Sequence, residues 1–131
     1  MKRATVSAAA VAVLVNAASE EQAASIANAL VGERLAACVN IVSPIRSVYR
    51  WKGEIQTDAE HLMIIKTRAD LVAKVEARVR ALHSYEVPEV IALPIVASAR
   101  SYLDWVFDST GTEPRSVRKA PRMVVRAKRK K

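Results

Sequence analysis

The sequence predicts one α+β sandwich with the element order βαββαβ, a long hairpin between its second and third strands, and a short helix at its end. Two observations predict this class. Short apolar runs typical of strands alternate with stretches whose apolar residues recur at helical spacing. In the middle of the chain, two extended runs of about 14 residues meet at one tight turn, whereas a strand usually has about 5–6 residues.

The first strand and the first helix are marked by an apolar run and a capping motif. Residues 11–15 are apolar and rich in valine, which predicts a buried strand over about residues 5–16. The same start could be a signal peptide, but its removal would take away a strand that the fold needs. Ser19 and Gln22 form a capping box, in which each side chain binds the other residue's amide, and they predict a helix over residues 20–34.

The hairpin is predicted over residues 36–51 and 54–67, with Lys52 and Gly53 in the turn because glycine tolerates a positive φ. Pro44 cannot donate a hydrogen bond to a neighbouring strand. We therefore expect a bulge or an exposed sheet edge at that residue.

The length of the hairpin predicts an oligomer. A helix of about 13 residues spans about 20 Å, whereas a strand of about 14 residues spans about 46 Å. Half of each arm is therefore left without a cover, and an open apolar edge invites aggregation. We expect a closed ring of subunits joined by strand pairing, with Tyr49, Trp51 and Ile55 in the interface.

The second half of the chain repeats the pattern of the first. A helix is predicted over residues 70–82 with Asp70 as its cap, followed by a loop over 83–86 and a strand over 87–96. A short helix is expected over 101–107. Right-handed crossovers place both long helices on one face of a four-stranded antiparallel sheet, which is the ferredoxin-like arrangement.

The excess positive charge lies at the end of the chain. The formal net charge is +8, and residues 110–131 hold nine Lys or Arg residues with Glu113 as their only acid, so residues 1–109 are balanced. We expect residues 1–109 to form the folded domain and 110–131 to be a basic, disordered tail. The tail could bind nucleic acid or an anionic surface by counterion release, or it could simply aid solubility.

Four residues are candidates for metal binding. Cys38 is a soft ligand for copper or zinc, although its apolar surroundings also suit packing. His83 lies in a loop with Glu86 and Glu89, and imidazole with carboxylate suits a divalent cation. His83 could equally stabilise a helix end. A lone cysteine rules out a disulfide within the chain and predicts a cytoplasmic protein.

Three other residues lie at element ends where a cleft between subunits could form. Lys66, Tyr85 and Trp105 could bind a small anionic ligand there, although the two aromatic residues could equally serve as interface packing. No nucleophile elbow, phosphate-binding loop or dinucleotide fingerprint is present in the sequence. The sequence therefore predicts a protein that is not an enzyme and does not span a membrane.

Several strings, in order and at matching spacing over about residues 11–107, resemble the CutA divalent-cation tolerance family. They are LAACVNI at 35–41, YRWKGEI at 49–55, IKT at 65–67, HSYEVPEVI at 83–91 and YLDW at 102–105. The resemblance implies a ferredoxin-like subunit, a homotrimer, and a part in tolerance of copper and other divalent metals. It implies no known reaction.

The sequence departs from the family pattern at the copper ligands proposed for some members. Val15 stands at the position of a cysteine, and Leu82 at that of the first of two histidines, so His83 alone remains. Ser84 stands where a proline is usual. An alternative function comes from the fold alone, since the trimeric PII signalling proteins share it and bind small ligands between subunits.

Overall fold

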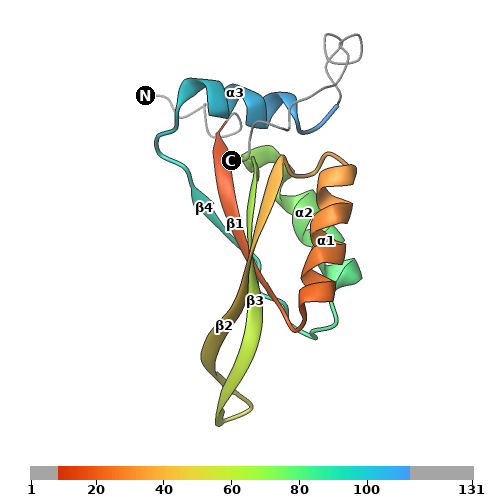
Figure 1. The fold of residues 1–131 in the computed structure, drawn as a ribbon, viewed down its shortest axis with the longest axis vertical. Coiled ribbons are helices and arrows are strands. Elements are labelled where there is room, and N and C mark those ends of the chain that lie inside the picture. The colour runs from red at the N-terminus through yellow and green to blue at the C-terminus, as the bar shows by residue number, and fades with distance from the viewer. Residues whose placement is uncertain (1–8, 113–131) are drawn as a thin grey trace.

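Figure 1 shows the computed structural model, which describes residues 9–112. The expected element order is confirmed. The elements are β1 (Ala10–Ala17), α1 (Glu20–Gly32), β2 (Cys38–Trp51), β3 (Glu54–Arg68), a 3-10 turn (Ala69–Leu71), α2 (Val72–Leu82), β4 (Ile91–Pro94) and α3 (Arg100–Asp108). The predicted tail, apart from its first three residues, lies outside the described residues. Within the described part, no helix is long and apolar enough to cross a bilayer.

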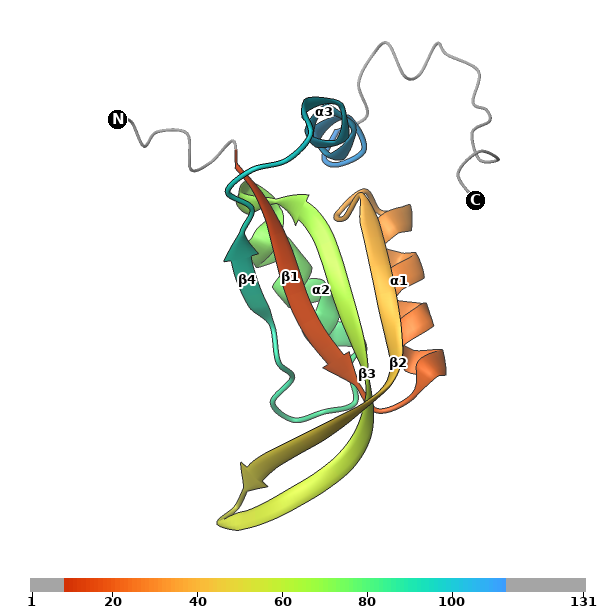
Figure 2. The ribbon, with the colours of Figure 1, turned by 60° about the vertical axis from the view of Figure 1, so that its left-hand side comes forward.

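The four strands form one antiparallel sheet in the order β2-β3-β1-β4, with β1 paired to both β3 and β4. This is the ferredoxin-like order that the sequence predicts. Figure 2 shows both long helices behind the sheet, on the same face. The core lies between the sheet and these helices, and its largest fully buried side chains are Val13, Val15, Ile26, Leu30, Met63, Ile65, Val75 and Val79.

The second face of the sheet has no helix over it. Side chains alternate between the two faces of a strand, and the odd residues of β1 and β3 are those that meet the helices. The even residues therefore line the uncovered face. The register places Asn40, Ile64, Leu14 and Ile91 in one row across it, and Cys38, Lys66, Ala12 and Leu93 in the next.

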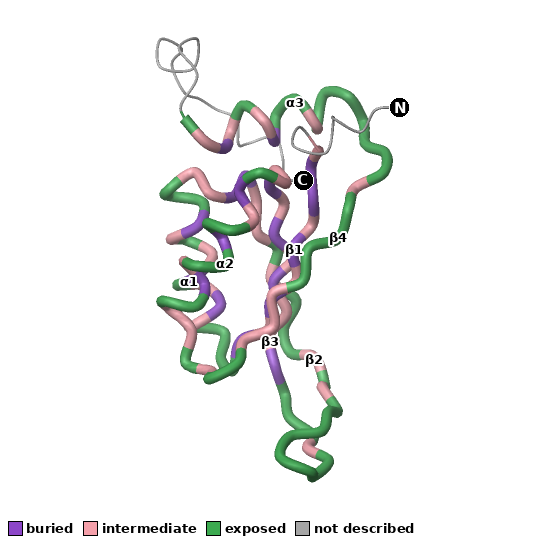
Figure 3. Tube along the Cα trace, turned by 180° about the vertical axis from the view of Figure 1, so that it is seen from behind, coloured by how far each residue is buried: buried purple, intermediate pink, exposed green. Residues whose placement is uncertain are grey.

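The hairpin extends well past the rest of the sheet (Figure 1). β1 pairs with β3 only as far as His61, so residues 54–60 of β3 pair with β2 alone. The register shifts between Val42 and Ile45, which confirms the bulge expected at Pro44. Figure 3 shows that this extension is almost entirely exposed.

Four details differ from the sequence prediction. The fourth strand covers Ile91–Pro94 and not residues 87–96, because the chain before it forms a loop beside the end of β1. Asp70 does not cap α2, because its carboxylate binds the Arg68 guanidinium through two hydrogen bonds of 3.0 Å. Helix α1 ends at Gly32, before the expected residue 34, since Arg34 adopts a positive φ of 60°.

The fourth difference concerns the capping box. The Ser19 hydroxyl accepts a hydrogen bond from the Gln22 amide at 3.1 Å, as expected. Gln22 does not reach back to Ser19, however, because its side-chain oxygen accepts instead from the Ser84 hydroxyl at 3.3 Å. The start of α1 is thereby tied to the loop that follows α2.

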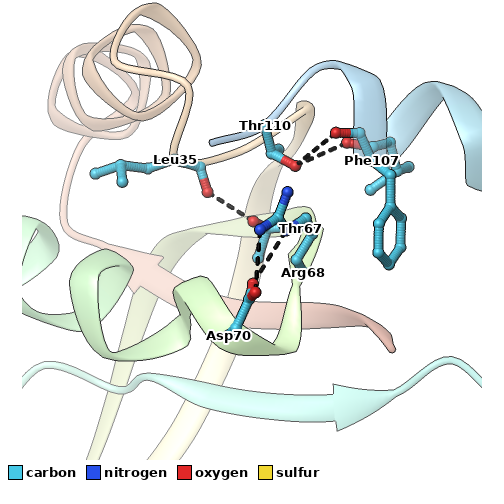
Figure 4. A network of polar contacts seen from close by, with 7 residues as sticks. Leu35, Thr67, Arg68, Asp70, Phe107 and Thr110 are labelled. Carbon is cyan, nitrogen blue, oxygen red and sulfur yellow. Dashed lines mark hydrogen bonds and ion pairs between the residues drawn. The ribbon is translucent and has the colours of Figure 1, made fainter. Parts of the chain in front are cut away.

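The end of the sheet opposite the hairpin is closed by α3 and its C-terminal turn (Figure 4). The Thr67 hydroxyl, fully buried at the end of β3, donates to the Leu35 carbonyl at 2.7 Å. The neighbouring Arg68 lies over the ring of Phe107 at 5.6 Å. The chain after α3 is held by Arg34, whose Nε donates to the Gly111 carbonyl at 2.8 Å. These contacts hold the chain after α3, as far as Gly111, against the end of the sheet.

The Thr67 hydrogen bond provides a test of this closure. We expect Thr67→Val, which has nearly the same shape, to lower the free energy of unfolding by about 1–3 kcal/mol because the Leu35 carbonyl loses its donor in a buried place. The measurement is urea unfolding at equal protein concentration. Thr112→Val, at an exposed position, is the matched control and should stay within about 0.5 kcal/mol of the parent. Equal stability of the two variants would contradict the prediction.

Candidate functional site

The candidate site is a pocket at the root of the hairpin. Its volume is about 760 Å³, and it lies between the loop that follows α2 and the face of the hairpin that carries Tyr49 and Trp51. The strand end at Asn16 also contributes to its wall. The remaining lining residues are Ser47, Val48, Glu60, Ser84, Tyr85, Glu86, Val87 and Glu89. Three carboxylates and three aromatic rings thus line one cavity, and no described lining residue is basic.

Glu60 is the most deeply placed acid of the pocket, with only 6% of its surface exposed. Its Oε2 accepts a hydrogen bond from the Tyr85 hydroxyl at 2.6 Å, and its Oε1 accepts from Asn16 Nδ2 at 3.4 Å. The same Asn16 nitrogen donates to Glu89 Oε1 at 3.1 Å. One amide group therefore joins two carboxylates. Within the described residues, neither carboxylate has a Lys or Arg partner.

His83 holds the loop against β1. Its Nδ1 accepts a hydrogen bond from the Tyr85 amide at 3.1 Å, which requires that nitrogen to be unprotonated. Nε2 therefore carries the proton and donates to the Asn16 carbonyl at 2.6 Å. Both ring nitrogens of a neutral imidazole are thus engaged. This contact also uses the Asn16 carbonyl, so β4 pairs with β1 no further than Leu14.

The crowding of acids perturbs the ionisation of the pocket. Burial, and secondly the charge of Glu60, raises the pKa of the Glu89 carboxyl above its ordinary value. Burial also raises the pKa of Tyr85 far above that of a free phenol, and its hydrogen bond to Glu60 adds to the shift. Tyr85 therefore stays a neutral donor to Glu60 at any physiological pH.

The predicted metal ligands are separated in the structure. Glu86 and Glu89 line the pocket and His83 lies next to it, but Cys38 lies on the uncovered face at the opposite end of β1. The Cys38 thiol lies 3.7 Å from Asn40 Oδ1. Among residues 9–112, no group of three His, Cys, Asp or Glu side chains is placed to hold a metal ion. The residues of one described chain thus do not fit a metal centre.

The predicted ligand cleft is also divided. Tyr85 lines the pocket, whereas Lys66 binds Asn40 Oδ1 on the uncovered face, beside Cys38. Trp105 lies on α3 and packs at 5.5 Å against Tyr102. The single chain therefore places Tyr85 at one end of β1 and the other two residues near the other end.

The three predicted interface residues lie at the outer part of the hairpin. Tyr49 and Trp51 are on the pocket side, and the Tyr49 hydroxyl donates to Asp58. Ile55 is opposite Arg50 in the register, so it lies on the other face, with 68% of its surface exposed. All three are exposed in the single chain.

Sequence reasoning missed Asn16 and Glu60. Asn16 is a polar residue at the end of an otherwise apolar strand, which could have marked it. Glu60 sits in the polar half of the hairpin and resembles its exposed neighbours in type. Its burial comes from Tyr85, which lies 25 residues away in the chain.

The fold and the pocket define the class of this protein as a ferredoxin-like subunit with a long hairpin, a ligand-sized cavity at its root and one uncovered sheet face. Residues 11–109 match the family described as CutA1 divalent ion tolerance protein. The chain therefore belongs to the CutA family.

Individual relatives agree with this assignment. The chain is 54% identical over 99 residues to the divalent-cation tolerance protein CutA of Thermus thermophilus, a match that covers 76% of this chain and 96% of that protein. It is 49% identical to the chloroplastic CutA of Arabidopsis thaliana, covering 76% of this chain but only 55% of that longer protein.

Solved structures agree as well. The Thermus thermophilus CutA1 structure has a TM-score of 0.77 at 52% identity and covers 78% of this chain and 99% of its own. A structure described as the periplasmic CutA of Archaeoglobus fulgidus has a TM-score of 0.75 at 40% identity. It covers 76% of this chain and 97% of its own.

The raised pKa of Glu89 predicts that replacing its carboxylate with a neutral group stabilises the folded protein, by an amount that depends on pH. As pH rises above the ordinary carboxyl value, the unfolded chain loses this proton before the folded protein does, so folding becomes less favourable until the folded pKa is passed. We expect Glu89→Gln to be more stable than the parent at pH 7 and equal to it near pH 4, measured by thermal unfolding. Glu86→Gln, at an exposed position in the same loop, is the control. A difference that does not change with pH would contradict the prediction.

Proposed function

We propose that this protein works as a homotrimer in the tolerance of divalent cations, copper among them, and that it has no catalytic activity. The observation that carries the proposal is the uncovered sheet face of a chain that belongs to the CutA family. The family is named for tolerance of divalent ions and not for a reaction. The lone thiol, Cys38, supports a cytoplasmic location.

The uncovered face supports the trimer more directly than the hairpin does. Leu14, Ile64 and Ile91 share one row on it, and Leu93 lies in the next row. Ile91 and Leu93 are 46% and 44% exposed in the single chain. A contiguous apolar surface on an open sheet, beside an unpaired edge strand, marks a protein interface. Copies that meet on this face would cover it and also bring the exposed hairpins together.

Metal contact in this protein, we propose, uses donors from more than one subunit. His83 has both ring nitrogens engaged, so it could bind a metal only by releasing Asn16 or Tyr85. Cys38 lies on the face where copies would meet, so its thiol is the soft donor best placed to join others from neighbouring chains. Glu86 and Glu89 remain hard donors in the pocket.

A second candidate function is that of a small-ligand sensor, and the pocket at the hairpin root favours it. Its volume of about 760 Å³ lies in the range of small-molecule sites, and its lining combines aromatic rings with a few converging polar groups. The analogy with PII proteins adds only that this fold can serve such a role. Binding of nucleic acid by the basic tail stays a prediction from the sequence, because residues 113–131 lie outside the described part.

The trimer is tested by the mass of the protein in solution. We expect the parent to sediment at three times the 14.3 kDa of one chain at micromolar concentration. Ile64→Lys places a charge on the uncovered face and should reduce the mass to that of a single chain or abolish folding, whereas Ala73→Lys on the exposed side of α2 should leave a trimer. A parent that sediments as folded single chains would refute the proposal.

The metal function is tested by calorimetry and by growth. We expect the trimer to bind Cu(I) and Cys38→Ser to bind it at least about tenfold more weakly, because a thiolate is a far better soft ligand than a hydroxyl. His83→Ala should change stability more than copper affinity, since its ring is structural. In a host that lacks its own CutA protein, the parent should restore growth in copper. Absence of both copper binding and growth rescue would contradict the proposed metal function, and only the fold and the family would remain supported.

A further inference from the structure

Two acids of the pocket have no positive partner among the described residues. Glu60 is almost fully buried, and its two hydrogen bonds come from Tyr85 and Asn16, which are both neutral. Glu89 shares the Asn16 donor. A buried carboxylate without a cation is costly, and two beside one another are more so. Such an arrangement is expected where a cation from outside the subunit completes the charge balance.

A second, independent observation lies in the same place. The side-chain oxygen of Asn16 is buried and accepts no hydrogen bond within the described part of the chain. Buried polar atoms nearly always have a partner, and an exception calls for an explanation. Because the Asn16 nitrogen faces both carboxylates, its orientation is fixed and cannot be reversed to satisfy the oxygen. The oxygen at the other end of this amide is therefore a buried acceptor whose donor must come from outside the described residues.

We propose that the pocket at the hairpin root binds the ammonium group of an organic cation that carries an apolar or aromatic body. This inference rests on the proposed small-ligand function of the same pocket and names the ligand class. Glu89 and the exposed Glu86 are the acids that an entering ammonium group meets first, and Glu60 reinforces them from behind. The aromatic residues Tyr49, Trp51 and Tyr85 provide both apolar area and π faces, which attract cations.

The lining argues against other ligand classes. An anion would meet three carboxylates and no basic side chain from the described residues, so the sequence-based expectation of an anionic ligand does not suit this pocket. A bare metal ion would need three or more ligating groups in close array, and the described residues of one chain provide no such group without donors from a neighbouring copy. An alkylammonium ion needs only two or three acceptors on one side and apolar surface on the other.

The ammonium chemistry could come from two sources. One is a free small amine. The other is a basic side chain of a neighbouring copy, because Arg46, Arg50 and Lys52 all lie on the exposed part of the hairpin. The shared chemistry is a cationic nitrogen on a hydrocarbon stem, and the experiment distinguishes the sources.

The test uses the full-length trimer and three probes of matched shape, namely benzylamine, benzyl alcohol and benzoate. We expect calorimetry to show binding of benzylamine only. Glu89→Gln should weaken this binding by about tenfold, because a neutral amide oxygen replaces a charged acceptor of the ammonium hydrogen bond. Glu76→Gln, which loses only a surface pair with Arg80, should bind like the parent. Because Glu89→Gln keeps an oxygen for Asn16, it should remain folded, which thermal unfolding checks.

The outcomes separate the possibilities. Benzylamine binding to the parent trimer supports a free amine as ligand. Binding that appears only after Arg46, Arg50 and Lys52 are changed to Gln supports a side chain of a neighbouring copy as the occupant. Lack of benzylamine binding in all of these proteins overturns the proposal. If benzoate binds instead, and Tyr85→Phe or Glu89→Gln alters its affinity, the pocket is a ligand site but its cation preference is wrong. If none of the three probes binds to any protein, the small-ligand function itself fails.

Discussion

The constraint on which the rest of the structure depends is that two helices cover only one face of a four-stranded sheet. The core between the sheet and the helices is fully buried, from Val13 in β1 to Val79 in α2. The opposite face presents Leu14, Ile64 and Ile91 to the surroundings. A sheet of this kind gains stability when it meets another apolar surface. The uncovered face therefore links the fold of one chain to the trimer that we propose.

The second organising feature is the point where β1 ends and the hairpin continues alone. Asn16 marks it, because its backbone carbonyl accepts from His83 and its side chain joins Glu60 to Glu89. The loop after α2 is thus held under the sheet and cannot extend β4. The same contacts that shorten the fourth strand create the pocket. Where β4 no longer pairs with β1, the chain leaves a cavity into which polar side chains converge.

The sequence was sufficient to predict the elements that depend on local pattern. The helical stripe of Ile26 and Leu30, the bulge near Pro44 and the turn at Gly53 all follow from residue type and spacing, and the structure confirms them. The expected strand over 87–96 was wrong because β-propensity favours it, while a tertiary contact through His83 decides otherwise. Local pattern is reliable where neighbours in sequence are also neighbours in space.

The candidate site could be predicted only in part, for the same reason. Glu86 and Glu89 were identified through the loop that they share with His83, and Tyr85 as a residue at the end of an element. All three line the pocket. Asn16 and Glu60 come from strands far away in the sequence. The polar Asn16 at the end of an apolar strand was only a weak signal, and Glu60 is of the same type as its exposed neighbours. Lys66 and Trp105 were grouped with Tyr85 because all lie at element ends, but the strands between them separate two ends of one sheet.

The positions of the charged residues determine the charge of the pocket, and the net charge of the chain does not. The formal net charge is +8, yet the pocket is lined by Glu60, Glu86 and Glu89 with no basic residue from the described part. The basic residues of the hairpin, Arg46, Arg50 and Lys52, are exposed on the same extension whose root forms the pocket. The acids Glu54 and Asp58 lie on the same extension, so these basic side chains are single exposed charges on a hairpin that is close to neutral as a whole. If a neighbouring copy places one of these basic side chains in the cavity, a small cation that competes for the cavity would also act on the assembly of copies.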